Sequence, residues 1–535
     1  NSTPEAQERI ADVLGAIPYR NSLPFLAEVR MTSSVPEVRG ATERAMLRID
    51  PSALSKSTPE LYLELANRYY RQIADVTSFP TEDFQLLWEF RPQTGLFMTA
   101  IRTPVYHEAM AMGLAERTLK LEETNVDALS LWLASNLRRE LQTPEGYENP
   151  AYGADRRDAM YFAVAAGSTS AQRVLERALA DRDTQLARRA IAAIEQTAGA
   201  TSLVATKLPT QPLLAALTYP NRRVRYEAAL AIGRSQPSQG FEGADRVVPT
   251  LAGAIREATA KYVAIIAADP EKYTSVRGML EKEGFTVLPR GKDVAELMGP
   301  IAEVPAVDLI VSVDPTVEQF PMIVADAAGS SKLSATPVLG LTEATILPDL
   351  RSRYETSQNV AVRPLALNER EIAAAVNQLI DSASGGPITS QEAAMYTSRA
   401  LAVLRDLAVQ NNTVLNVADA GTSLVRSLTE TQGEVKQQIA EVLARIDQKQ
   451  TQVALMEAAL AASGSERLEL IAKVTDSAKR FGNRLDPRHV TRVLELAESD
   501  NIAEATAGAA LAGALDLTNE GLVPMILGET QQAAR

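Results

Sequence analysis

The stretch Tyr262-Val-Ala-Ile-Ile-Ala267 is a short, unbroken run of apolar residues with strong strand preference. Four more apolar runs follow it, at residues 285–288, 308–313, 338–341 and 359–362. Helical patterns lie between the runs, the first at 270–283 and the last at 368–380. Apolar strands that alternate with helices are typical of a parallel sheet covered on both faces. Residues 260–384 are therefore predicted to form a doubly wound α/β domain.

The segment before this domain repeats a helical pattern. Residues 178–194 align without gaps with residues 216–232, and each segment contains a polar, helix-breaking turn. The matched apolar pairs are Leu179 with Leu217, Leu186 with Val224, Ala190 with Ala228, and Ile194 with Ile232. Their spacing places them on one stripe of a helix. Such a stripe is buried only when another helical pair stacks on it, which predicts an array of helical hairpins.

Two stretches resemble known helical repeats. Val224-Arg225, followed by the small residues Ala228-Ala229-Leu230, resembles a HEAT repeat. Residues 115–134 resemble a tetratricopeptide repeat or, equally, a generic helical hairpin. The resemblance implies α-solenoid arms of HEAT-like and TPR-like hairpins at residues 1–256 and 388–535. The predicted fold class is thus mainly α, with one inserted α/β domain.

The inserted domain resembles the receiver domain of bacterial response regulators, which has a flavodoxin-like fold. Asp269, after the first strand, resembles one of that family's two Mg²⁺-binding acids. Thr336-Pro-Val-Leu-Gly-Leu-Thr342 resembles its fourth strand, with Thr342 as the switch threonine. Arg363-Pro364 occupies the place of the family's Lys-Pro pair. The resemblance implies a pocket of Asp269, Asp314, Thr342 and Arg363 at one edge of the sheet.

This pocket departs from the family pattern at several positions. Ala268 replaces the first acid, and Val313 stands where the family has its phosphorylated aspartate. Asp314 comes one residue late, and a one-residue slip along a strand turns a side chain to the other face. Arg363 keeps the charge of the family lysine but not its compact ammonium. These changes predict a pseudo-receiver that is not phosphorylated and binds no Mg²⁺; alternatively, a local bulge returns Asp314 to the pocket and phosphorylation survives with Mg²⁺.

Composition excludes several kinds of chemistry. The chain has no cysteine, which excludes disulfides and thiolate sites, and its only histidines are His107 and His489. Nucleotide-binding loops, zinc-protease motifs and calcium-loop patterns are absent from the sequence. We therefore predict no catalytic residue, no cofactor and no resident metal. The net charge of −13 makes nucleic acid an unlikely partner, although Arg222, Arg223 and Arg225 form a basic cluster.

Two local predictions concern packing. Thr389-Ser-Gln-Glu392 is expected to begin a helix as a capping box, in which each end residue bonds to the other's backbone. Trp88 and Trp132 lie among leucine and phenylalanine at helical spacing and are expected to belong to helical cores.

The sequence therefore predicts a non-enzymatic scaffold for protein–protein interaction, a subunit of a larger bacterial assembly or a homo-oligomer. The alternatives are a signalling protein whose receiver is phosphorylated on Asp314 or regulated by a ligand, and, more distantly, a nucleic-acid-binding HEAT protein. No apolar run is long enough to span a membrane. The absence of cysteine favours the bacterial periplasm or envelope over the cytoplasm, and the start at Asn1 is expected to reflect processing or truncation.

Overall fold

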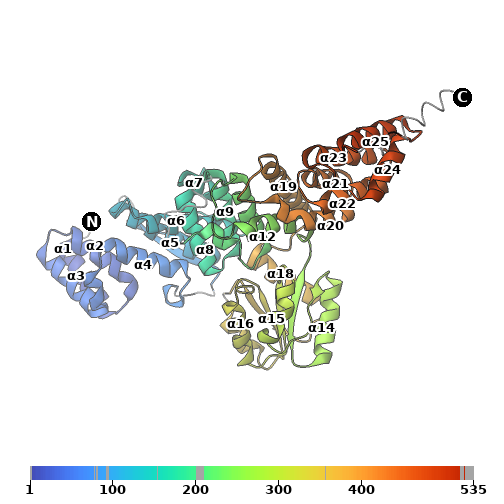
Figure 1. The fold of residues 1–535 in the computed structure, drawn as a ribbon. Coiled ribbons are helices and arrows are strands. Elements are labelled where there is room, and N and C mark those ends of the chain that lie inside the picture. Colours follow the sequence, from blue (N-terminus) through green and yellow to red (C-terminus); the bar gives the residue numbers. More distant parts are fainter. Residues whose placement is uncertain are drawn as a thin grey trace. The chain divides into compact units, whose positions relative to one another are not determined.

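The computed structural model describes residues 3–517 together with residue 523, apart from residues 78, 80, 81, 92–94, 154, 200–209 and 356. Most of these residues are helical, and five parallel strands form the larger of two sheets (Figure 1). The predicted class, mainly helical with an α/β part, is confirmed at this level. Among the described residues, no helix is both long and apolar enough to cross a membrane.

The chain divides into two compact units, which do not coincide with the three predicted domains. Residues up to 181, with 185–197, form the first unit; residues 182–184 and those from 198 onward form the second. The second unit therefore joins the α/β residues to helices on both sides of them in the sequence.

The first unit consists of helices and one β-hairpin. Its α-helices are α1 (Pro4–Ala16), α2 (Leu23–Thr32), α3 (Pro36–Ile49), α4 (Thr58–Tyr70), α5 (Tyr106–Leu121), α6 (Val126–Gln142), α7 (Ala159–Ala165), α8 (Gly167–Asp181) and α9 (Thr184–Thr197). Its short 3₁₀ helices are η1 (Arg20–Ser22), η2 (Pro51–Ser55), η3 (Ala74–Val76) and η4 (Thr103–Val105). Helices that are close in sequence pack together, for example α2 on α3, α4 on α5 and α5 on α6. This is the packing expected of helical hairpins.

The hairpin lies where the sequence predicted only helices. Strand β1 (Phe84–Arg91) pairs antiparallel with β2 (Gly95–Arg102). Trp88 lies on β1 and is 60% exposed, so its predicted place in a helical core is wrong. Bulky residues alternate along β1 with a period of two, and this favours a strand over a helix. Trp132 lies on α6 and is half-buried, and its indole N–H donates to a carboxylate oxygen of Glu116 over 2.9 Å.

The second unit contains helices on both sides of the α/β residues. Its first helices are α11 (Pro212–Ala216), α12 (Arg222–Ser235), η5 (Ala244–Arg246) and α13 (Val247–Arg256). Its last helices are α19 (Ser390–Val409), η6 (Val417–Ala420), α20 (Gly421–Glu430), α21 (Gly433–Leu443), α22 (Lys449–Ala461), α23 (Gly464–Phe481), α24 (Pro487–Ala497) and α25 (Ile502–Ala514). Helices α12 and α13 both pack on α19, so helices far apart in sequence share one core.

Three of the four pairs matched in the sequence repeat are buried on α9 and α12. The buried residues are Leu186, Ala190 and Ile194 on α9, and Val224, Ala228 and Ile232 on α12. A polar turn precedes each helix: Arg182 adopts a left-handed φ of 61°, and the Asn221 side chain accepts a hydrogen bond from the Arg223 backbone N–H. The turn and the last three matched pairs form as the sequence predicts, but Leu179 lies on α8 and Leu217 follows α11, so the first pair does not belong to the same helical stripe.

The α/β part is a parallel sheet with helices on both faces. Its strands are β3 (Tyr262–Ala267), β4 (Thr286–Val287), β5 (Leu309–Val313), β6 (Val338–Thr342) and β7 (Val360–Pro364). Its helices are α14 (Pro270–Lys282), α15 (Val294–Glu303), α16 (Gln319–Gly329), α17 (Leu347–Arg353) and α18 (Glu369–Ser384). The strand order is β4-β3-β5-β6-β7, and every pair is parallel. β4 is shorter than the predicted strand at 285–288, and the other strands lie close to their predicted places.

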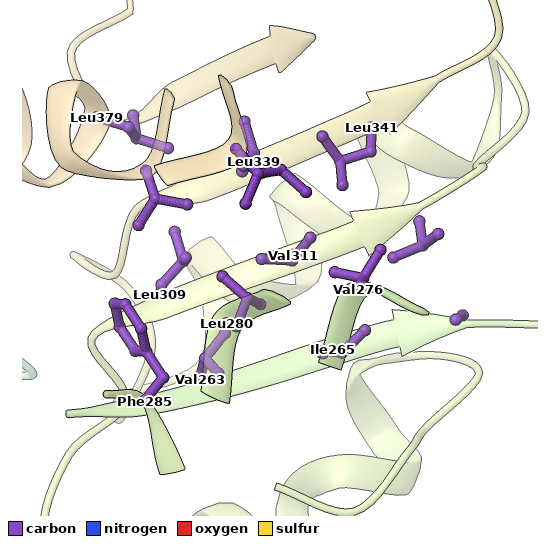
Figure 2. Packing of buried hydrophobic residues seen from close by; sticks show 14 of the residues in the cluster. Val263, Ile265, Val276, Leu280, Phe285, Leu309, Val311, Leu339, Leu341 and Leu379 are labelled. Carbon is purple, nitrogen blue, oxygen red and sulfur yellow. The ribbon is translucent and has the colours of Figure 1, made fainter. Parts of the chain in front are cut away.

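Alternate residues of the strands build two separate cores. Figure 2 shows one face, where Val263 and Ile265 of β3 lie with residues of the neighbouring strands, facing Val276 and Leu280 of α14. Ala264 and Ile266 point to the other face, which α15, α16 and α17 cover. Because both faces are buried, the strands need apolar residues at every position.

Gly340 of β6 is fixed by packing on the face covered by α16. A Cβ at this position would lie 2.7 Å from the ring of Phe320, which is fully buried. Since real Cβ atoms do not approach other atoms so closely, only glycine fits here without movement of the ring.

Candidate functional site

The carboxyl ends of β3 and β5 form the candidate site. The chain leaves β3 toward β4 on one side, while β5 lies on the other side of β3. Open α/β sheets bind ligands in the crevice outside such a switch point. A cavity of about 330 Å³ lies here, and residues that end or follow the two strands line it, including Ala267, Ala268, Val313 and Asp314.

Asp269 caps the helix that follows β3. One carboxylate oxygen accepts hydrogen bonds from the backbone N–H groups of Glu271, at 2.7 Å, and of Lys272, at 3.4 Å. A short acidic side chain at this position satisfies donors that a helix leaves unpaired at its start. Asp269 thus has a structural task at the place where the sequence suggested a metal ligand.

Asp314 follows the last residue of β5 and has a left-handed φ of 53°. Its backbone N–H donates to the carbonyl of Leu341 over 2.7 Å. Its carboxylate accepts a hydrogen bond from the ammonium of Lys272 on α14. Since β5 ends at Val313, the alternation of a strand no longer decides where Asp314 points, and the sequence argument from a one-residue slip does not apply.

Lys272 is the residue of this site that the sequence analysis missed. Its ammonium forms an ion pair with Asp314, and the carboxylates of Asp269 and Glu343 also lie within its electrostatic reach. The hydrogen bond with Asp314 raises the pKa of Lys272 above its ordinary value, and the surrounding negative charges raise it further. A usable sequence signal exists: Lys272 lies in the first helical turn after Asp269, so its side chain starts at the same edge of the sheet.

Thr342 and Arg363 have other partners. Thr342 ends β6, is fully buried, and donates from its hydroxyl to the carbonyl of Glu343 over 3.2 Å. Arg363 on β7 donates to its neighbour Val362 and, over 3.2 Å, to the side chain of Gln378 on α18. The structure thus brings Asp269 and Asp314 together around Lys272, and it gives Thr342 and Arg363 hydrogen bonds elsewhere.

Both carboxylates of this site are already bound to other groups of the chain. Mg²⁺ requires a nearly ideal octahedron of oxygen ligands. Here Asp269 accepts two backbone N–H groups and Asp314 is bound to an ammonium. In the part of the chain that the structure describes, no group of three or more histidine or acidic residues is placed to hold a metal.

Comparisons with known proteins add no assignment: no family model, curated protein or solved structure matches the chain. The site is therefore interpreted from its own residues.

A second cluster of charged residues lies where the α/β residues meet α12. The side chain of Arg222 is 3% exposed and binds one carboxylate oxygen of Asp308 at 2.7 Å. It also donates to the carbonyls of Glu257 and Ala260, in the segment that leads into β3. The other oxygen of Asp308 accepts the backbone N–H of Tyr262 over 2.8 Å. Arg222 therefore holds the segment where the chain enters the sheet.

Two further arginines of α12 hold other parts of the same junction. Arg223 binds both carboxylate oxygens of Glu392, at 2.7 and 2.6 Å, and the carbonyl of Gly386 at 2.6 Å. Gly386 lies in the segment that leaves α18, and Glu392 lies in the first turn of α19. Arg225 donates over 2.7 Å to the carbonyl of Pro305, just before β5. Arg222, Arg223 and Arg225, here called the arginine triplet, thus contact the sheet and both of its connections.

The arginine triplet was also the best sequence argument for nucleic-acid binding. Phosphate contacts need guanidinium groups that solvent can reach. Arg222 and Arg223 are 3–4% exposed at their side chains and are already bound to Asp308 and Glu392. These contacts favour a structural role for the triplet.

Proposed function

We propose that this chain is a non-enzymatic scaffold for protein–protein interaction in a larger bacterial assembly. Its helical hairpins would be degenerate HEAT and tetratricopeptide repeats, and its α/β part a pseudo-receiver that serves as a docking module. The buried stripes on α9 and α12 and the strand order of the sheet support these resemblances. Stacked hairpins offer extended surfaces to partners without any need for catalysis.

One observation carries the proposal: the ammonium of Lys272 is bound to Asp314. In a working receiver, the corresponding edge of the sheet holds Mg²⁺ and the phosphorylated aspartate. A cation fixed to the chain compensates the charge of Asp314, and a Mg²⁺ ion would have to displace it. Phosphorylation of Asp314 would likewise have to break this pair.

The arginine triplet supports a docking role over a switching role. Receiver-based switches depend on small movements of the domain relative to its neighbours. Here, buried charge-assisted hydrogen bonds hold both the entry and the exit of the α/β part. An element held at both connections by buried ion pairs is suited to act as a fixed surface.

Incubation of the full chain with acetyl phosphate and Mg²⁺ tests the proposal. We expect intact-mass spectrometry to detect no added phosphoryl group, because the ammonium of Lys272 already compensates the charge of Asp314. A response-regulator receiver treated in parallel provides the positive control. A hydroxylamine-sensitive phosphate on the wild-type chain, missing from an Asp314→Asn variant, would contradict the pseudo-receiver.

A signalling protein with a working or ligand-regulated receiver is the second candidate. Two observations favour it: the left-handed backbone at Asp314 departs from strand geometry, and Asp314 lines the cavity of about 330 Å³. The pairing of β5 with β6 is regular to Val313, so the change of direction at Asp314 comes from the turn after the strand. The same phosphorylation experiment distinguishes the two candidates.

A further inference from the structure

The β1–β2 hairpin of the first unit presents a continuous apolar face. In an antiparallel pair, residues directly opposite each other share a face. The register pairs Phe84 with Arg102, Leu86 with Ala100, Trp88 with Met98, and Phe90 with Leu96. Six of these eight residues are large and apolar, and each of the six is 43% to 73% exposed. Single exposed apolar residues are normal on a protein surface, but a contiguous patch of this kind marks an interaction site.

The opposite face of the hairpin is used differently. Gln85 and Ile101, which form an opposed pair at the base, are buried. The side-chain amide of Gln85 donates to the carbonyl of Phe79 over 2.7 Å. Farther along, the same face carries the opposed pair Glu89 and Phe97, of which Phe97 is 39% exposed. One face is therefore anchored to the unit at its base, while the face around Trp88 is left to solvent.

A two-stranded ribbon gains stability when further strands or a helix pack against it. Isolated hairpins are marginal in water. In the described residues, β1 and β2 form a two-stranded sheet of their own, and at its base the backbone N–H of Arg102 donates to the hydroxyl of Tyr147 over 3.1 Å. A partner that covers the exposed face would add packing to this ribbon.

We propose that the occupant of this face is a second copy of the same chain, so that the hairpin is the interface of a homodimer. The inference rests on the proposed scaffold function and identifies one partner of the scaffold. Of the eight residues on the face, only Arg102 is charged, and its guanidinium lies 5.0 Å from the ring centre of Phe84 at the base. A partner with a charged surface would find few opposite charges on this face. An identical apolar face is complementary by symmetry, and the cores of homodimer interfaces are apolar and depleted in charge.

The area of the face agrees with this assignment. An aromatic side chain buries about 150–250 Å² when it is fully covered. With three half-exposed aromatics, two leucines and one methionine, the face can bury on the order of 600 Å². A standard interface buries about 800 Å² per partner, so modest additional contacts at the strand edges complete a stable dimer.

Sedimentation velocity on the full chain tests the proposal. We expect the wild type to sediment as a dimer at micromolar concentration. The variant Trp88→Lys is expected to weaken association about 30-fold or more, because it removes a central aromatic and sets two positive charges against each other across the two-fold axis. Thr99→Lys is the matched control, since it adds the same charge to the same hairpin on the opposite face. It is expected to leave the dissociation constant nearly unchanged.

Several outcomes would overturn the dimer. A wild type that stays monomeric at high micromolar concentration would do so, as would equal weakening by Trp88→Lys and Thr99→Lys. Flotation of a monomeric wild type with neutral phosphatidylcholine vesicles, lost in Trp88→Lys, would assign the face to lipid instead. None of these results depends on Asp314, so a failure here is distinct from a failure of the pseudo-receiver.

Discussion

Replacement of Arg223 with alanine is expected to lower the free energy of opening at the α12–α19 contact by about 3 kcal/mol. The side chain of Arg223 is 4% exposed and binds both oxygens of Glu392, which is itself only 17% exposed. The variant removes both guanidinium contacts to this partly buried carboxylate, and it also removes the donor to Gly386. Native-state hydrogen exchange of the amides in α12 and α19 measures the change.

A matched control is available on the same unit. Arg256 also forms a two-point ion pair with a glutamate, Glu430, at 3.1 and 3.2 Å, but both side chains are exposed. Exposed ion pairs contribute little, so Arg256→Ala is expected to leave hydrogen exchange almost unchanged. Adding Glu392→Gln to Arg223→Ala should restore part of the lost free energy of opening, because it removes the partly buried negative charge. Equal effects of Arg223→Ala and Arg256→Ala would contradict the account of the arginine triplet.

Acidification from pH 6.5 to pH 4 is expected to destabilise the first unit by roughly 3 kcal/mol through His107 alone. Burial, helped by the positive charge of Arg138, lowers the pKa of His107 from 6.5 to about 4. Between these values the unfolded chain binds a proton that the folded chain does not, so stability is lost as the pH falls. From about one pH unit above 6.5 the ring is neutral in both states, and this contribution is constant. Urea unfolding followed by tryptophan fluorescence reports on this unit, since Trp88 and Trp132 both belong to it.

Two variants separate the proton site of His107 from its packing. His107→Gln removes the titrating group. The loss of unfolding free energy between pH 6.5 and pH 4 should therefore shrink by roughly 3 kcal/mol. Thr77→Ala removes the hydrogen bond of 2.6 Å between the Thr77 hydroxyl and the His107 ring but keeps the buried imidazole. This second variant should lower the free energy of unfolding at every pH and leave its dependence on pH unchanged. An unchanged slope in His107→Gln would show that the acid sensitivity has another source.

The sequence could predict the α/β part because its determinants are local. The central strands β3, β5 and β6 are apolar runs buried on both faces, and polar helix starts separate the runs. Asp269 shows the limit of such reasoning. Its position after β3 suggested a metal ligand, whereas the helix start that follows uses the same carboxylate as a cap. Both interpretations place an acid at this position, and only the three-dimensional contacts distinguish them.

Long-range partners explain most of what the sequence did not predict. Thr389 does accept the backbone N–H of Glu392, as a capping box requires, but the Glu392 carboxylate binds Arg223, far away in sequence. Lys272 meets Asp314 because parallel strands place their carboxyl ends at one edge. The hairpin around Trp88 is different, because the period-two alternation of bulky residues along β1 is itself a local strand signal. For Glu392 and Lys272, the deciding contact lies outside the local pattern.

The central claim, that the α/β part is a fixed module and not a phosphorylation switch, is tested most directly at its two connections. Hydrogen exchange is measured over residues 257–261 and 385–388 of the full chain, with and without acetyl phosphate and Mg²⁺. Arg222 and Arg223 hold these segments through buried contacts, so we expect identical exchange under both conditions. Faster exchange with the phosphate donor, abolished by Asp314→Asn, would contradict the claim.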